Sequence, residues 1–203
     1  MLVQGDETGD VPLVEIAKEY VKEKYQKPGA VFMGVVHRLD RPVSGVVVLA
    51  RTSKALERMN ELFRTRQTTK IYWALVDKTP PQQAATLVHW LWKDEKKNRV
   101  QAYASERTGA ARSELSYQFI QPVGPYFLLE VRPITGRSHQ IRVQLASMGC
   151  SIVGDVKYGA AFPNADASIC LHARRLEFAH PVKKERMAVA APAPQIHPWN
   201  LLG

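Results

Sequence analysis

A short polar segment between two apolar stretches contains the residues best suited to chemistry in this sequence. Its members, all within eight positions, are His37, Arg38, Asp40, Arg41 and Ser44. A carboxylate such as Asp40 can act as a nucleophile or exchange protons with a substrate, and loops on a rigid scaffold are where such groups usually lie. The alternative is an ion pair between Asp40 and the flanking arginines at the surface, which would stabilise the fold little. The residue types alone leave both interpretations open.

A second polar segment combines Arg132 with the sequence TGRSHQIR over residues 135–142. Its glycine precedes a predicted helix, whose first backbone N–H groups have no partner within the helix and can bind an anion. The chain would present Arg137, Ser138 and His139 at this point. A capped helix with arginine on its solvent-facing side is the alternative interpretation.

Several common forms of enzyme chemistry are not indicated by the sequence. Neither the GxxxxGK[ST] loop that holds nucleotide phosphates nor the GxGxxG turn that holds dinucleotides occurs. The six histidines show no HxH or HExxH spacing, and Cys150 and Cys170 form no CxxC pair. We therefore predict no metal, no cofactor and two reduced thiols. Ser44 lacks the preceding glycine of a hydrolase nucleophile elbow.

The chain is strongly basic, with 28 Lys and Arg against 19 Asp and Glu, a net charge of +9 and an isoelectric point near 9.7. The surplus lies in residues 28–70 and 131–203, with five charges in each, and these segments contain the two polar clusters. Such a balance is typical of nucleic-acid binding, because each cation that meets a phosphate releases condensed counterions. A basic surface that serves solubility is the alternative.

The length of 203 residues and the 45% of hydrophobic residues favour one globular domain. No apolar run approaches the roughly 18 to 20 residues that a membrane-spanning helix needs, and the acidic start does not resemble a signal peptide. We therefore expect a soluble, cytoplasmic protein without membrane contact.

Apolar residues at helical spacing predict helices over residues 13–27, 53–65 and 138–148. Asp10 is the expected N-cap of the first helix and Ser53 that of the second. The buried face of the first helix is predicted to contain Leu13, Ile16, Ala17, Tyr20 and Val21.

Short segments rich in β-branched and aromatic residues predict strands. Their ranges are 31–36, 45–50, 70–77, 87–92, 100–103, 113–120, 126–132 and 169–178. The mixed-charge residues 93–99 are predicted to form a solvated hairpin tip, and the segment from Ala188 onward shows little pattern. These elements favour an α+β fold, with a mixed, mostly antiparallel sheet and flanking helices.

Four blocks of the sequence resemble, in order, the signature blocks of the RluA-type pseudouridine synthases. They are HRLDRPVSGVVVLARTSKAL (37–56), KIYWALV (70–76), GRSHQIRVQLASMGCSIVGDVKYG (136–159) and LHARRLEFAHP (171–181). The resemblance implies the pseudouridine synthase catalytic fold and an RNA substrate, a stem-loop of ribosomal or transfer RNA. It implies isomerisation of uridine to pseudouridine without a cofactor.

The resemblance also implies roles for individual residues. The invariant catalytic aspartate of the family corresponds to Asp40, its basic partner to Arg137, and its active-site tyrosine, which stacks on the target base, to Tyr72. Arg38 would enter the space that the flipped nucleotide leaves. His37, Arg41 and His139 would join it in binding RNA, and the uracil pocket would have an apolar side formed by Ile152, Val153 and Leu171.

We expect residues 1–203 to form one catalytic domain that acts as a monomer. The family usually opens with a strand reading roughly vvNKPaG, and this chain begins at the segment that follows it, so we expect either that this first strand is missing or that the chain is a divergent form. No appended S4-type RNA-binding domain is expected. Two alternatives remain: a catalytically silent RNA-binding or ribosome-assembly factor on the same fold, and a ribonuclease that uses His37 and His139.

Overall fold

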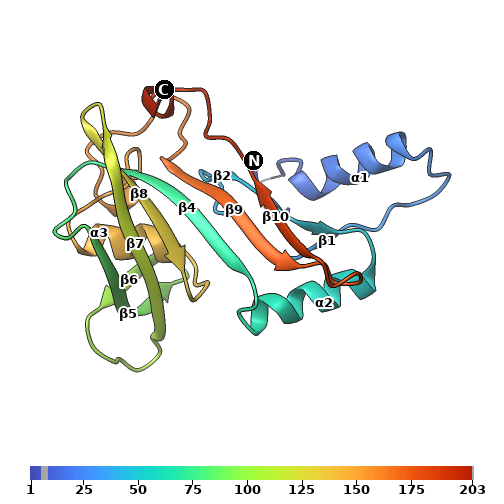
Figure 1. Ribbon diagram of the computed structural model, residues 1–203, viewed down its shortest axis with the longest axis horizontal. Helices are drawn as coiled ribbons and strands as arrows, with labels where there is room; N and C mark the ends of the chain where they lie inside the picture. The colour runs from blue at the N-terminus through green and yellow to red at the C-terminus, as the bar shows by residue number, and fades with distance from the viewer. Residues whose placement is uncertain (6–8, 203) are drawn as a thin grey trace. The chain divides into compact units, whose positions relative to one another are not determined.

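The computed structural model describes residues 1–5 and 9–202 and divides the chain into two compact units (Figure 1). The first unit consists of residues 1–42, 46–69 and 176–189, and the second of residues 43–45, 70–175 and 190–203. The fold is the predicted mixture of helices and a mostly antiparallel sheet. The expectation of one catalytic domain stays a prediction, and each unit is described by itself.

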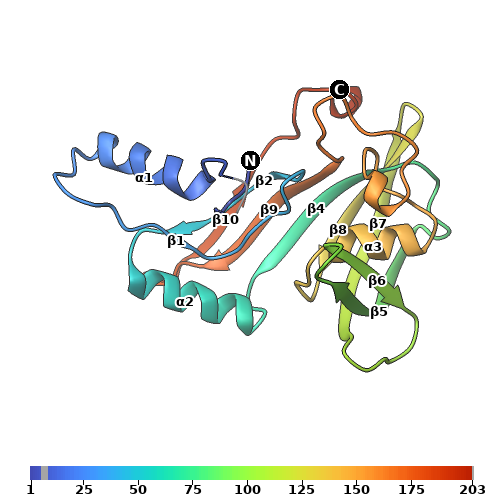
Figure 2. The same ribbon diagram turned by 180° about the vertical axis from the view of Figure 1, so that it is seen from behind.

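The first unit contains two of the three α-helices, α1 (Leu13–Lys24) and α2 (Ser53–Arg64), among the described residues. Strands β1 (Gly34–Val35) and β3 (Leu49–Ala50) pair antiparallel. Both are shorter than the predicted strands over residues 31–36 and 45–50. Strand β10 (Arg186–Ala190), which the sequence pattern did not predict, pairs with β9 (Leu171–Ala179). Figure 2 shows β10 alongside β9 from behind.

Helix α1 forms as predicted, but its N-cap and part of its buried face are different. Val14 and Val21 are buried and pack with Met33, whereas Ile16 and Tyr20 are 42% and 57% exposed. The prediction that these two side chains face inward was therefore wrong. The helix lies at the surface of a small cluster, which needs only a narrow apolar stripe.

Both predicted N-caps were displaced by one or two residues. Pro12 occupies the N-cap position of α1, and no side chain caps that helix, because the carboxylate of Asp10 pairs with Arg41 instead. For α2 the cap is Thr52 rather than Ser53, and its Oγ1 accepts a hydrogen bond from the Ala55 N–H at 3.1 Å. A threonine at this position satisfies one of the N–H groups that the first helical turn leaves without partners.

The second unit is built on a sheet of long strands. Its strand order is β9-β4-β8-β7-β5-β6, and β2 (Ser44–Gly45) pairs parallel with β9. The strands are β4 (Thr69–Val76), β5 (Ala84–Asp94), β6 (Arg99–Tyr103), β7 (Ala111–Val123) and β8 (Tyr126–Pro133). The pairs from β4 to β6 are antiparallel, and residues 95–98 form the predicted hairpin tip between β5 and β6.

Helix α3 (Gln140–Ser147) packs against β5 and β6, and two short 3-10 helices, η1 (Val156–Tyr158) and η2 (Trp199–Leu202), complete the unit. Its core is closely packed around Leu75, Leu115, Leu129 and Leu145, whose exposed fractions are all 0%. Cys150 and Cys170 are free thiols in the same core. Burial raises the pKa of Cys170 to about 11. None of the helices within the described residues has the length and apolar character to cross a membrane.

Candidate active site

The loop that bears Asp40 belongs to the first unit, and His37 fixes its beginning. The His37 ring stacks on Phe63 of α2 with a centroid distance of 5.0 Å, and its Nε2 accepts a hydrogen bond from the Val48 N–H at 3.0 Å. The ring is half-buried. These contacts give His37 a role in holding the loop, although the sequence suggested contact with RNA.

Asp40, Arg38 and Arg41 of this loop differ in exposure and in ion pairing. Asp40 is half-buried and Arg38 is exposed. Arg41 is exposed too, but it pairs with Asp10 of the same unit, so part of its charge is already compensated. Between the two arginines, Arg38 is therefore the better candidate for contact with a phosphate or for insertion into RNA.

The end of this loop belongs to the second unit, where Ser44 and Gly45 are anchored on β9 in register with His172 and Ala173. A side chain at Gly45 would overlap the backbone of Ala173, so only glycine allows this approach. Ser44 Oγ lies 2.8 Å from His172 Nδ1, and His172 Nε2 lies 3.2 Å from the Ala191 carbonyl oxygen. Because Nε2 must donate to that carbonyl, Nδ1 accepts the proton of Ser44.

His172 is 2% exposed, and burial lowers the pKa of its imidazole. The nearby charge of Arg174 lowers it further, while the hydrogen bond to the Ala191 carbonyl acts in the opposite direction. The neutral ring can therefore keep accepting from Ser44. This hydrogen bond holds the chain four residues after Asp40.

Tyr72 lies on β4 of the second unit, opposite Val131 of β8, and packs half-buried against the main core. Ile152, Val153 and Leu171 belong to that same core and are 1%, 8% and 4% exposed. Tyr72 and the three residues expected to line the uracil pocket thus meet in one apolar cluster. The burial of these three favours core packing as their main role.

A second loop of this unit presents Arg137. Gly136, Arg137 and Ser138 are exposed between β8 and α3. Lys70 comes from the start of β4, and its Nζ would lie 3.7 Å from a Cβ placed on Gly136. The KIYWALV and GRSHQIR blocks are therefore neighbours in space, and they place two cations near this turn.

His139, which follows this turn, is directed into the protein. Its backbone is left-handed (φ 50°) at the N-cap of α3, and the residue is only 9% exposed. Its Nδ1 lies 2.7 Å from the Tyr158 hydroxyl, which also accepts from the Val100 N–H at 2.8 Å. These contacts support a structural role for His139, and the RNA contact expected for it stays a prediction.

Sequence reasoning missed a buried ion pair behind this loop, between Arg142 and Asp155. Arg142 Nε and Nη2 donate to the two carboxylate oxygens at 2.7 and 2.8 Å, and the guanidinium also lies over the Tyr158 ring at 5.0 Å. The available signal was the occurrence of opposite charges within one apolar block, residues 136–159. The described part of the chain contains no group of His, Cys, Asp and Glu side chains that could hold a metal ion.

Two solved structures share this fold. The human RNA pseudouridylate synthase domain-containing protein 4 superimposes with a TM-score of 0.78 at 24% identity, covering 96% of this chain and 82% of that one. The human RNA pseudouridylate synthase domain-containing protein 1 superimposes with a TM-score of 0.70 at 26% identity. The superposition covers 88% of this chain and 75% of that one. The fold is therefore that of pseudouridylate synthase domains.

The sequence comparisons identify the family. The model of the RNA pseudouridylate synthase family matches residues 1–147, so the chain belongs to this family. An uncharacterized RNA pseudouridine synthase of Chlorobaculum parvum is 32% identical over 179 residues, which cover 80% of this chain and 55% of that protein. The ribosomal large subunit pseudouridine synthase C of Vibrio cholerae is 29% identical over 178 residues, which cover 82% and 53%. The chain thus spans about half the length of these two curated relatives.

Proposed function

We propose that this protein is an RNA pseudouridine synthase that uses Asp40 as its essential residue. The observation that carries the proposal is the family match over residues 1–147, a range that contains Asp40, Tyr72 and Arg137. The anchored loop around Asp40 and the exposed Arg137 support it, because each lies on a loop held by a packed scaffold.

The proposed reaction is an isomerisation within one nucleotide. The N1–C1′ bond breaks, the uracil turns, a C5–C1′ bond forms, and the C5 proton is released while N1 gains a proton. Asp40 either attacks C1′ or the base as a nucleophile, or removes the C2′ proton to give a glycal. No electrons enter or leave, so the proposal includes no cofactor and no metal.

We assign supporting roles to three further residues. Arg137 has the role of the basic residue that the family pairs with its aspartate, because a guanidinium can donate charge-assisted hydrogen bonds, and Tyr72 stacks on the uracil. Arg38 enters the space left by the flipped nucleotide, since the glycosidic bond of a stacked base is out of reach. Flipping costs on the order of a few kcal/mol, which such filling contacts offset.

The proposed substrate is a stem-loop of ribosomal or transfer RNA, bound by a monomer in the cytoplasm. The net charge of +9 supports a polyanionic partner. The name of the Vibrio cholerae relative supports ribosomal RNA of the large subunit as the first substrate to try.

The decisive experiment incubates the protein with RNA that contains uridine labelled with tritium at C5. Release of tritium, followed by carbodiimide primer-extension mapping, demonstrates isomerisation and locates the uridine. RNA binding without release contradicts the proposal and favours the silent assembly factor. Shortened RNA would instead indicate a ribonuclease.

A further inference from the structure

We propose that Gln140 is a positioning residue for Arg137, holding the backbone of the exposed arginine in one place. The effect of Gln140 on catalysis rests on the proposed function. Its effect on the position of the Arg137 backbone is independent of that function. Gln140 is the first residue of α3 and is 4% exposed. Its buried side-chain amide therefore lies next to the backbone of the exposed Arg137.

The Gln140 amide uses both of its ends on the segment that precedes it. Oε1 accepts from the Thr135 hydroxyl at 2.8 Å and from the Arg137 backbone N–H at 3.0 Å. Nε2 donates to the Glu114 carbonyl oxygen at 3.0 Å. One side chain therefore connects the Arg137 backbone, the preceding threonine and strand β7.

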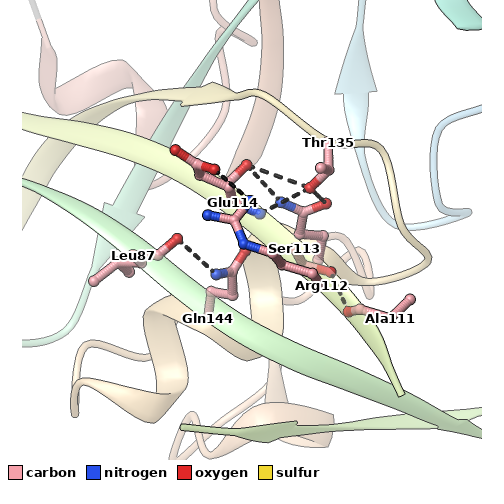
Figure 3. Close-up of polar contacts among 8 residues, drawn as sticks. Leu87, Ala111, Arg112, Ser113, Glu114, Thr135 and Gln144 are labelled. Carbon is pink, nitrogen blue, oxygen red and sulfur yellow. Dashed lines mark hydrogen bonds and ion pairs between the residues drawn. The ribbon is translucent and has the colours of Figure 1, made fainter. Parts of the chain in front are cut away.

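Strand β7 provides the fixed end of this arrangement. Glu114 donates its N–H to Thr135 Oγ1 at 2.9 Å, and its carbonyl accepts from the N–H groups of Ile134 and Thr135 at 2.9 and 3.1 Å. Figure 3 shows Thr135 beside Glu114 on the strand. Because Glu114 lies in a paired strand, the loop is tied to the sheet rather than to another loop.

The contact with Arg137 is reciprocal. The Gln140 N–H donates to the Arg137 carbonyl at 3.2 Å, while the Gln140 side chain reaches back three residues to the Arg137 N–H. The Gln of a capping box also reaches back three residues, but from the third helical position to the N-cap, whereas Gln140 is the first residue of α3 and bonds a residue before the N-cap. The Arg137 backbone is thus bonded on both sides, although Gly136 precedes it and would otherwise loosen the turn.

The chain offers a matched control in Gln144, one helical turn further along α3. Gln144 is 0% exposed, and its Nε2 donates to the Leu87 carbonyl at 3.1 Å (Figure 3). The same Nε2 lies 3.1 Å from His89 Nδ1. Leu87 and His89 both lie on β5. Replacement of either glutamine by methionine removes a buried amide from the same helix at similar volume, but only Gln140 touches the Arg137 backbone.

The first test measures amide hydrogen exchange at Arg137 in the protein without RNA. The wild type should protect this amide although the residue is exposed, and Gln140→Met should lose about tenfold in protection while Gln144→Met keeps it. Rapid exchange in the wild type, or equal loss in both methionine variants, overturns the proposal.

The second test measures turnover and RNA affinity separately. Gln140→Met should lower kcat by about ten- to a hundredfold, since small displacements of a catalytic group are costly, with Kd for RNA within about threefold. In an Arg137→Lys background the same change should have little further effect, whereas Gln144→Met should behave alike in both backgrounds. Independent, additive losses would overturn the positioning role. Absence of tritium release in the wild type would refute the proposed function, and amide exchange would still decide the role of Gln140.

Discussion

Arg142 and Asp155 face each other in the interior of the second unit, joined by two hydrogen bonds of 2.7 and 2.8 Å. Their side chains are only 6% and 1% exposed, so water hydrates neither charge and each depends on the other for compensation. A buried pair of this kind gains little over a well-packed apolar pair, but removal of one partner leaves an uncompensated charge. The pair therefore makes the block behind the Arg137 loop sensitive to single substitutions.

Asp155→Asn should lower the free energy of unfolding by about 3–5 kcal/mol, because the Arg142 charge stays buried without its counterion. Urea denaturation followed by circular dichroism measures this loss. Glu61→Gln, which disrupts the exposed pair with Arg64, is the control and should cost less than about 1 kcal/mol. Equal losses of unfolding free energy in both variants would show that the buried pair contributes no more to stability than the exposed pair does.

Asp40→Asn should abolish tritium release while the affinity for RNA stays within a few fold, because the amide keeps the shape of the carboxylate but cannot act as nucleophile or base. Filter binding and tritium release on the same RNA check the two halves of this prediction. An active Asp40→Asn protein would exclude the proposed mechanism.

Arg38→Ala should slow turnover with little change in initial RNA binding, since the lost contact forms only when the nucleotide leaves the stack. Single-turnover kinetics with saturating enzyme separate the two effects. Arg64→Ala removes an exposed arginine from α2 of the same unit and should leave turnover unchanged. Unchanged turnover in Arg38→Ala would count against insertion of this side chain.

Acidification should destabilise the protein through His172. The unfolded chain binds a proton on this residue near pH 6.5, whereas the lowered pKa of the folded imidazole delays protonation. Between the pKa of the folded imidazole and about pH 6.5, the unfolded state therefore binds more protons than the folded state. The contribution of His172 to the free energy of unfolding is fully present above about pH 6.5 and is lost as the pH falls toward the folded pKa. Urea titrations at about pH 7.5 and about pH 5.5 should show a smaller difference in His172→Gln. His89, whose pKa burial also lowers, keeps some of the pH dependence in that variant. An unchanged difference would contradict the prediction.

Sequence patterns were sufficient for elements whose own periodicity agrees with their packing. The predicted helix over residues 53–65 forms as α2, and its apolar positions face inward, with Met59 at 2% exposed and Leu56, Leu62 and Phe63 partly buried. Strand β10 could not be predicted, because all five of its residues are exposed and its order depends on pairing with β9. Pairing across the chain leaves no local signal when neither face is buried.

The candidate site shows the same limit. The signature blocks singled out Asp40, Tyr72 and Arg137 from residue types and order, and their roles stay predictions. The burial of His139 and Arg142 could not be anticipated, because polar residues near a helix start are usually solvated. Tyr158 and Asp155 are the partners that make this burial possible, and both lie in a separate turn of the chain.

The hydrogen bond between Ser44 and His172 joins positions 128 residues apart. Closure of so long a segment carries an entropic cost that grows with the logarithm of its length, and non-local pairing of this kind slows folding. During synthesis on the ribosome, the stretch that follows Asp40 can gain its partner strand only after the whole intervening chain has emerged. The stretch after Asp40 is thus made well before the strand that holds it, and it becomes fixed only when that strand has been made.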